Sequence, residues 1–202
     1  MSKTKIKYIC SNCGYESLRW IGKCPECESW NSFTEEIVET SSRKANISKS
    51  RFSYSKILDI SANEDDRIKT GIIEFDRVLG GGIMPGSVIL LGGDPGIGKS
   101  TIAMQAAASI KEKVLYVTGE ESEKQIKLRS SRLKVKSDSF FVQAETELSN
   151  IFGAIKEIAP SVVIIDSIQT TYRSELENSP GTITQIRECA AMLMEEAKKN
   201  HY

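Results

Sequence analysis

The chain has 202 residues, of which 40% are hydrophobic and 27% charged, and its formal net charge at pH 7 is zero. This composition fits one globular domain with a small appendage and excludes global disorder. The longest apolar run, residues 189–194, is far shorter than the about 20 residues of a membrane span, so no membrane association is expected. The N-terminus lacks the apolar stretch of a secretion signal, which predicts a cytoplasmic protein. The single histidine, His201, lies near the C-terminal end, which argues against a hydrolase with a histidine base.

Four cysteines near the N-terminus have the spacing C-x2-C-x10-C-x2-C: Cys10, Cys13, Cys24 and Cys27. Each C-x2-C pair forms a tight knuckle, and two knuckles supply the four thiolates of a tetrahedral zinc site. Such a site has no open coordination position and is therefore predicted to be structural. Two disulfides are the alternative, although they need an oxidising compartment, and iron–sulfur ligation also remains open.

Residues 1–34 form the expected zinc finger, in which the metal supplies the folding energy of a segment too small to bury a core. Trp20, Trp30 and Phe33 are expected to pack around the metal. A linker follows at residues 35–56. Its residues 40–55 contain six serines, four basic residues and no acid, which is typical of a solvated tether. Contact of these basic residues with a phosphate backbone is the alternative.

The remaining domain, residues 57–202, contains a phosphate-binding motif. Val88–Leu91 is a β-branched apolar run that predicts a strand buried on both faces. It leads into G-x4-G-K-[ST] and then into an expected helix at residues 101–111, which is the context that this motif requires. The loop residues are Gly93, Asp94, Pro95, Gly96, Ile97, Gly98, Lys99, Ser100 and Thr101. Their amides are expected to bind the phosphates of ATP at a helix N-terminus, while Lys99 reaches the β and γ phosphates and Ser100 ligates Mg²⁺.

A second expected strand, Val114–Thr118, precedes two acids. Glu120 is the candidate general base that activates the water attacking the γ-phosphate, and Glu121 is the expected capping acid of a helix over residues 123–133. The alternative is that both acids only stabilise the N-terminus of that helix through its macrodipole. The basic residues of this helix, Lys124, Lys127, Arg129 and Arg132, are expected on a solvated face.

A third expected strand, Val162–Ile165, ends in Asp166. A carboxylate at the C-terminal end of a buried strand beside the phosphate loop can hold magnesium through water. Capping of a turn is the alternative role for Asp166.

The other elements complete an alternation of strands and helices, which predicts a parallel sheet covered by helices. A strand is expected at Phe140–Gln143 and a helix at Leu148–Ile158. The last helix is expected over residues 180–199, with Ser179 as its N-cap. Cys189 within it is expected to be a small buried apolar residue.

Several motifs together resemble the RadA (or Sms) family, bacterial DNA-repair relatives of RecA. They are the four-cysteine finger, the glycine-rich run at residues 70–86, the phosphate loop GDPGIGKST, the segment GEES at residues 119–122, IDSIQT at residues 165–170, and SPG with RECA at residues 179–190. The resemblance extends along essentially the whole chain.

The resemblance implies a RecA-like P-loop NTPase core, with a parallel sheet flanked by helices, joined to a small N-terminal four-cysteine zinc ribbon. It implies a DNA-dependent ATPase that forms a homo-oligomeric ring on single-stranded DNA and processes branched recombination intermediates with RecA. Lys99 and Ser100 would bind ATP and magnesium, Asp166 would be the acid on the magnesium side, and Glu120 would match the catalytic glutamate. The loop at residues 170–181 would face DNA.

The family pattern also includes further strands, a K-x-R-F-G motif and a Lon-protease-like domain, none of which the sequence contains. A truncated chain is therefore expected, with a gap in the sheet between the Val88–Leu91 strand and the Asp166 strand that leaves two unpaired edges. Two other functions remain open: a nucleotide-gated protein-binding module without productive hydrolysis, and a RecA-like clock or signalling ATPase.

Overall fold

The computed structural model describes residues 4–39, 56–59, 66–135, 137–200 and 202. The chain divides into two compact units, residues 1–63 and 64–202. Within the described residues, no helix is long and apolar enough to cross a membrane.

The first unit contains a three-stranded antiparallel sheet in the order β2-β1-β3. Its strands are β1 (Thr4–Cys10), β2 (Glu16–Ser17) and β3 (Phe33–Glu39). The pairing of Cys10 with Phe33 places the first cysteine at the end of the sheet, where the knuckle begins. A short 3-10 helix, η1 (Ile57–Asp59), lies in the chain that follows.

The second unit is built on a three-stranded parallel sheet in the order β5-β4-β6. Its strands are β4 (Val114–Thr118), β5 (Phe140–Ala144) and β6 (Val162–Asp166). Its helices are α1 (Ile73–Val78), α2 (Lys99–Ser109), α3 (Glu123–Arg132), α4 (Leu148–Ile158) and α5 (Ile183–Asn200). The expected parallel sheet flanked by helices is confirmed.

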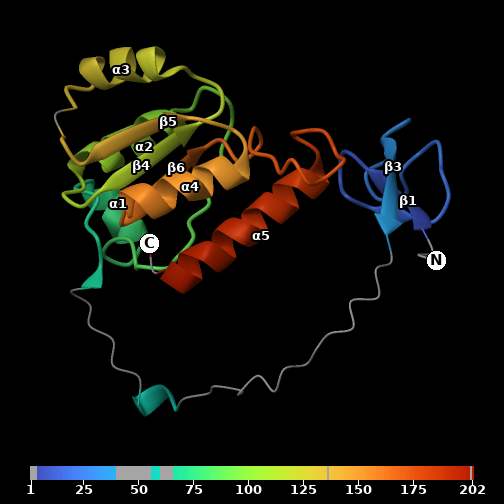
Figure 1. Cartoon of the computed structure of the whole chain (residues 1–202), viewed down its shortest axis with the longest axis horizontal. Helices are drawn as coiled ribbons and strands as arrows, with labels where there is room; N and C mark the ends of the chain where they lie inside the picture. Colours follow the sequence, from blue (N-terminus) through green and yellow to red (C-terminus); the bar gives the residue numbers. More distant parts are fainter. Residues whose placement is uncertain (1–3, 40–55, 60–65, 136, 201) are drawn as a thin grey trace. The chain divides into compact units, whose positions relative to one another are not determined.

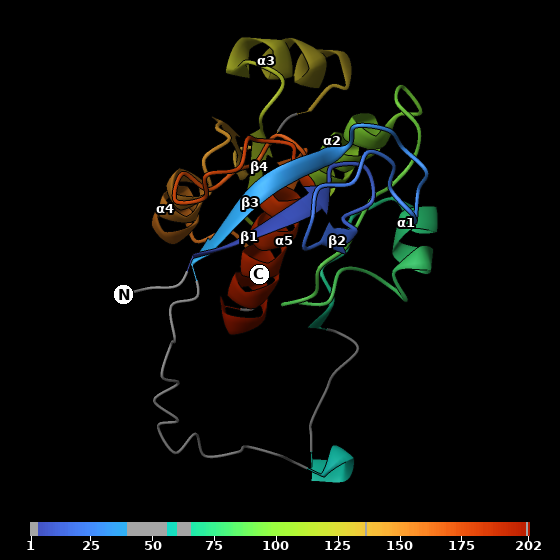
Figure 2. The same ribbon diagram turned by 90° about the vertical axis from the view of Figure 1, so that its right-hand side faces the viewer.

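Helices α2 and α4 cover opposite faces of this sheet (Figure 1). Every residue of β4 is buried, because β4 is the central strand and both of its faces are covered. Leu115 and Val117 pack against Ile151 and Ile155 of α4, whereas Tyr116 packs against Met104 of α2 on the other face. Figure 2 shows α3 and α4 on different sides of β4. Alternation of side chains along the strand produces this division into two faces.

The expected buried strand at Val88–Leu91 is wrong. These four residues have no regular secondary structure, and their exposed fractions are 53%, 40%, 86% and 38%. A strand is stable only when a neighbour takes up its backbone hydrogen bonds, and within the described residues β6 pairs with β4 alone. Val88–Leu91 has no such neighbour among the described residues, which explains why it does not form the expected strand.

The last helix begins later than expected. Helix α5 begins at Ile183, so Ser179 is not its N-cap and Pro180 is not its first residue. Gly181 has φ +82°, a left-handed conformation that an α-helix cannot contain. The Thr182 hydroxyl instead accepts a hydrogen bond from the Gln185 amide, which is the usual N-cap contact.

Candidate nucleotide and zinc sites

The four N-terminal cysteines converge in the first unit, with all four sulfur atoms within 4.8 Å of one another. Cys10 Sγ lies 3.6 Å from Cys27 Sγ, and Cys13 Sγ lies 3.5 Å from Cys24 Sγ. Ligands about 2.3 Å from a tetrahedral zinc ion lie about 3.8 Å from one another. The arrangement therefore fits Zn²⁺, and all five cysteines are free of disulfides, as the zinc prediction requires.

Hydrogen bonds around the sulfur atoms stabilise thiolates. The Ser29 side chain, followed by Asn12 and the Ser29 amide, lowers the pKa of Cys27 to about 5. The Tyr15 amide also lowers the pKa of Cys13, but desolvation and the three neighbouring sulfur atoms outweigh it and raise that pKa to about 12. Four thiolates this close repel one another, so full ionisation of the cluster needs the charge of a bound cation.

The aromatic residues of this unit behave differently from one another. Phe33 is buried against Cys10 and Cys24, as expected. Trp20 and Trp30 are 55% and 72% exposed, so the expectation that they pack around the metal is wrong. Both rings flank Gly22 on the surface of the knuckle. The side chains that pack around the buried cysteines are instead Tyr8, Tyr15, Ile21 and Phe33.

The phosphate loop is exposed and leads directly into α2. Side-chain atoms do not fill the loop, since a Cβ placed at Gly96 or Gly98 would meet no atom within 4 Å. The Lys99 ammonium donates hydrogen bonds to the carbonyl oxygens of Gly93 (2.7 Å) and Asp94 (2.9 Å). The loop amides at the N-terminus of α2 are therefore accessible to an anion, with the lysine beside them.

The carboxyl ends of β4 and β6 lie side by side, because these parallel strands pair Thr118 with Asp166. The Asp166 carboxylate accepts a hydrogen bond from the hydroxyl of Tyr116. Ser100 lies one turn before Met104 on α2, and Met104 packs against Tyr116, which places Ser100 on the side of α2 that is turned toward this phenol. The serine of the phosphate loop and the aspartate that ends β6 therefore converge, and their hydroxyl and carboxylate oxygens are ligands that suit Mg²⁺.

Glu120 is exposed at the end of β4, where its carboxylate accepts a hydrogen bond of 3.1 Å from the Ser167 hydroxyl. This contact joins the residues that follow β4 and β6. The exposed carboxylate can take a proton from a water molecule, as a general base must. Ser167 was missed by the sequence analysis, because a serine after a strand has no distinctive pattern.

Glu121 does not cap α3. The Ser122 side chain caps it, in a capping box with Gln125. The Glu121 carboxylate instead forms an ion pair with Arg129, whose side chain is 21% exposed. The expectation that Arg129 lies on a solvated face is therefore wrong, and this ion pair fixes α3 to the segment that carries Glu120.

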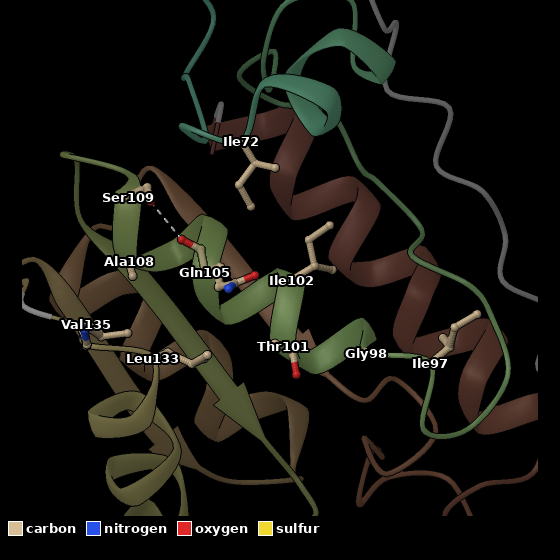
Figure 3. Close-up of a pocket in the computed structure, with 11 residues that line it drawn as sticks. Ile72, Ile97, Gly98, Thr101, Ile102, Gln105, Ala108, Ser109, Leu133 and Val135 are labelled. Carbon is tan, nitrogen blue, oxygen red and sulfur yellow. Dashed lines mark hydrogen bonds between the residues drawn. The ribbon is translucent and has the colours of Figure 1, made fainter.

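A groove of about 750 Å³ extends from the phosphate loop along α2 (Figure 3). Ile97 and Gly98 form its end at the loop, and Thr101, Ile102 and Gln105 of α2 line its centre. The other residues that line the groove are Ile72, Ala108, Ser109, Leu133, Lys134 and Val135. The groove is a mixed apolar and polar surface continuous with the phosphate loop.

The segment after β6 is held by a buried amide of α5. Gln185 is completely buried. Its side chain accepts a hydrogen bond from the Arg173 amide and donates to the carbonyl oxygens of Arg173 and Asn178. The Arg173 guanidinium lies 3.4 Å from Glu175 and 3.5 Å from Glu188. The one arginine of the loop expected to face DNA is thus surrounded by acids. Cys189 is buried, as predicted.

Two family models match the chain. The rubredoxin metal binding domain model matches residues 8–35, and the KaiC ATPase model matches residues 68–143. DNA repair protein RadA of Halalkalibacterium halodurans is 48% identical over 209 residues, which cover 98% of this chain and 45% of that protein. The RadA protein of Bacillus subtilis is 48% identical over 206 residues, which cover 98% of this chain and 45% of that protein. The RadA protein of Listeria monocytogenes is 44% identical over 207 residues, which cover 98% of this chain and 44% of that protein. A crystal structure of the RadB recombinase is 26% identical, with a TM-score of 0.49 and 66% of each chain covered.

The two family models and the two sites define a chain that joins a zinc-ribbon metal binding domain to a P-loop ATPase domain, with residues that suit Zn²⁺, ATP and Mg²⁺. The chain belongs to the family of DNA repair protein RadA. It spans about half the length of the curated relatives that it matches.

Proposed function

We propose that the chain is the nucleotide-binding part of a DNA-dependent ATPase of recombinational DNA repair. The observation that carries this proposal is the placement of Asp166 and Glu120 at the neighbouring carboxyl ends of two paired strands, in a chain whose phosphate loop is exposed at the start of α2. Identity to RadA proteins over nearly the whole chain supports the repair role.

The residues of the site have separate roles in this proposal. The amides of residues 93–101 and the Lys99 ammonium bind the phosphates. Ser100 and Asp166 would hold Mg²⁺, which when bound neutralises charge on the phosphate oxygens. Glu120 accepts the proton of the attacking water, and Ser167 orients its carboxylate. The four cysteines would hold a structural zinc ion.

We extend this proposal to the domain organisation and to the whole protein. It comprises a zinc finger, a linker and an ATPase core in a cytoplasmic protein. The expected boundary between finger and linker at residues 34 and 35 is too early, because β3 continues to Glu39 and pairs with β1. The whole protein would form a homo-oligomeric ring on single-stranded DNA and process branched intermediates with RecA. The names of the relatives support DNA repair, and the remaining points are extensions of that support.

Substitution of Lys99 tests the proposal. Lys99→Ala should reduce binding of ATP by the 202-residue chain by about tenfold or more, because it removes a charge-assisted contact with phosphate. Binding is measured by fluorescence with a labelled ATP analogue, and Lys111→Ala, which changes an exposed lysine just beyond α2, is the control. Equal affinities of Lys99→Ala and the unmodified chain would overturn the nucleotide site.

The exposure of Val88–Leu91, which leads into the phosphate loop, favours a second candidate: a nucleotide-gated binding module without productive hydrolysis. Glu120→Gln separates the two. If Glu120 is the base, the variant retains ATP binding and loses turnover, and single-stranded DNA stimulates turnover only in the unmodified protein. Absence of turnover from both proteins, with ATP binding retained, would favour the binding module.

A further inference from the structure

Tyr116 is a completely buried residue in the middle of β4. Its ring packs edge-on against Phe140, with the ring centres 6.0 Å apart and the planes at 75°. Met104 of α2 and Ile126 of α3 complete this apolar environment. A phenylalanine would fill such a position as well, so the hydroxyl must be explained by its own contacts, since a buried phenol needs a hydrogen-bond partner.

That partner is the Asp166 carboxylate, to which the Tyr116 hydroxyl donates a hydrogen bond at Oδ2. The strand register explains the contact. Tyr116 pairs with Ile164, so Asp166 lies two residues further along β6 and shares its face of the sheet.

Ser100, at the start of α2, lies one turn before Met104, which packs against Tyr116, so Ser100 lies on the face of α2 turned toward the same phenol. Ser100 and Asp166, which are far apart in the sequence, thus lie on either side of one hydroxyl group. These two residues are the ones proposed to hold magnesium. The hydrogen bond occupies one oxygen of the Asp166 carboxylate, whereas the other, Oδ1, accepts no hydrogen bond from the described residues.

We propose that Tyr116 is a positioning residue of the magnesium site, whose hydroxyl holds the Asp166 carboxylate and the Ser100 hydroxyl together before the nucleotide binds. The inference rests on the proposed nucleotide site. Without this hydroxyl both groups can rotate away, and their ordering must then occur when the metal binds, which weakens metal binding. The phosphate contacts of the loop amides and Lys99 do not involve Tyr116.

Tyr116→Phe tests the proposal, because it removes the hydroxyl and retains the ring. A labelled ADP is titrated onto the 202-residue chain at a series of Mg²⁺ concentrations and in EDTA. The Mg²⁺ concentration for half-maximal enhancement of binding should rise about tenfold, as expected for loss of one hydrogen bond to a charged group. The affinity for the nucleotide in EDTA should remain within a factor of about two, since loop and lysine are unchanged.

Phe140→Leu is the matched control, because it removes the ring partner of Tyr116 and leaves the hydroxyl contacts in place. It should lower the melting temperature without changing the Mg²⁺ requirement. A double variant tests whether Tyr116 acts through Asp166. In an Asp166→Asn background, adding Tyr116→Phe should change the Mg²⁺ requirement by less than about twofold, because the two residues act as a unit.

The outcomes separate this proposal from the one on which it rests. If Tyr116→Phe binds labelled ADP with the unmodified Mg²⁺ requirement, the positioning role is overturned while the nucleotide site stands. If Phe140→Leu raises the Mg²⁺ requirement as much as Tyr116→Phe does, packing and not the hydroxyl is responsible, and the proposal is also overturned. If the unmodified chain binds no nucleotide, the proposed function fails, and the positioning role fails with it.

Discussion

Gly119 separates the end of β4 from Glu120, and the chain passes very close to it. A Cβ built at this position would lie 2.0 Å from Thr170 Oγ1, 2.6 Å from Thr170 Cβ and 2.8 Å from Thr146 Cγ2. Gly119→Ala should therefore lower the free energy of unfolding by about 1–3 kcal/mol through overpacking, as measured by urea denaturation. Gly153→Ala is the control, since its Cβ meets no atom on the exposed side of α4. That variant should be stabilised by about 1 kcal/mol. Equal destabilisation of both variants would contradict the close approach.

The lowered pKa of Glu147 predicts how the free energy of unfolding depends on pH. Burial raises its pKa, but hydrogen bonds from Ser149, Asn150 and Ser174 outweigh burial, so the pKa lies below its ordinary value. Its carboxylate therefore stabilises the folded state above the unfolded-state pKa, and this contribution is lost as the pH falls through the lowered folded-state pKa. The free energy of unfolding of Glu147→Gln should fall less steeply than that of the unmodified chain in this acid range. Parallel profiles in urea titrations at successive pH values would be evidence against this.

At the scale of elements, the sequence pattern predicts a helix or strand correctly where residues close together in the sequence determine it. The bounds of β4 and α4 are those expected, since an apolar run and an amphipathic period mark each of them. Val88–Leu91 differs because a strand depends on a partner that its own residues do not specify. The phosphate loop was predicted from its motif. The contact of Tyr116 with Asp166 was not, because it depends on the register of β4 against β6.

Helix α5 carries a prediction about the loop at residues 173–178. Gln185→Ala removes three hydrogen bonds to the main chain of this loop, which should cost about 2–4 kcal/mol at roughly 1 kcal/mol each plus the unpaired main-chain groups. Hydrogen exchange of the loop amides should accelerate, as measured by mass spectrometry. Arg187→Ala, on an exposed position of the same helix, is the control. Unchanged exchange in Gln185→Ala would show that the amide does not hold the loop.

At the scale of the whole molecule, the two units depend on different forces. The first has a small apolar cluster around its cysteines, so its fold should require zinc. The protein should contain one zinc ion per chain by atomic absorption. Cys27→Ser should lose most of this metal, and the dispersed amide signals of residues 8–35 should collapse in an NMR spectrum. Ser29→Ala removes a hydrogen-bond contact with the Cys27 sulfur atom but none of the four metal ligands, so this variant should retain the metal.

The second unit exposes an apolar run at Val88–Leu91, and among the described residues β6 pairs on one side only. Such surfaces favour self-association. Leu90, which is 86% exposed, can be replaced at little cost to the fold. Leu90→Lys should reduce the aggregated fraction of the 202-residue chain about twofold or more in light scattering. Leu128→Lys, at an isolated exposed position of α3, should not. An equal effect of both variants would indicate that added charge alone is responsible.

The hydrogen bonds from the Gln185 side chain to the loop involve only main-chain atoms of Arg173 and Asn178. These three hydrogen bonds therefore do not depend on the identity of the exposed side chain at position 177. A fluorophore attached at Glu177, which is exposed, would report on events near this loop without altering its course. The segment is thus a suitable place to attach a spectroscopic probe.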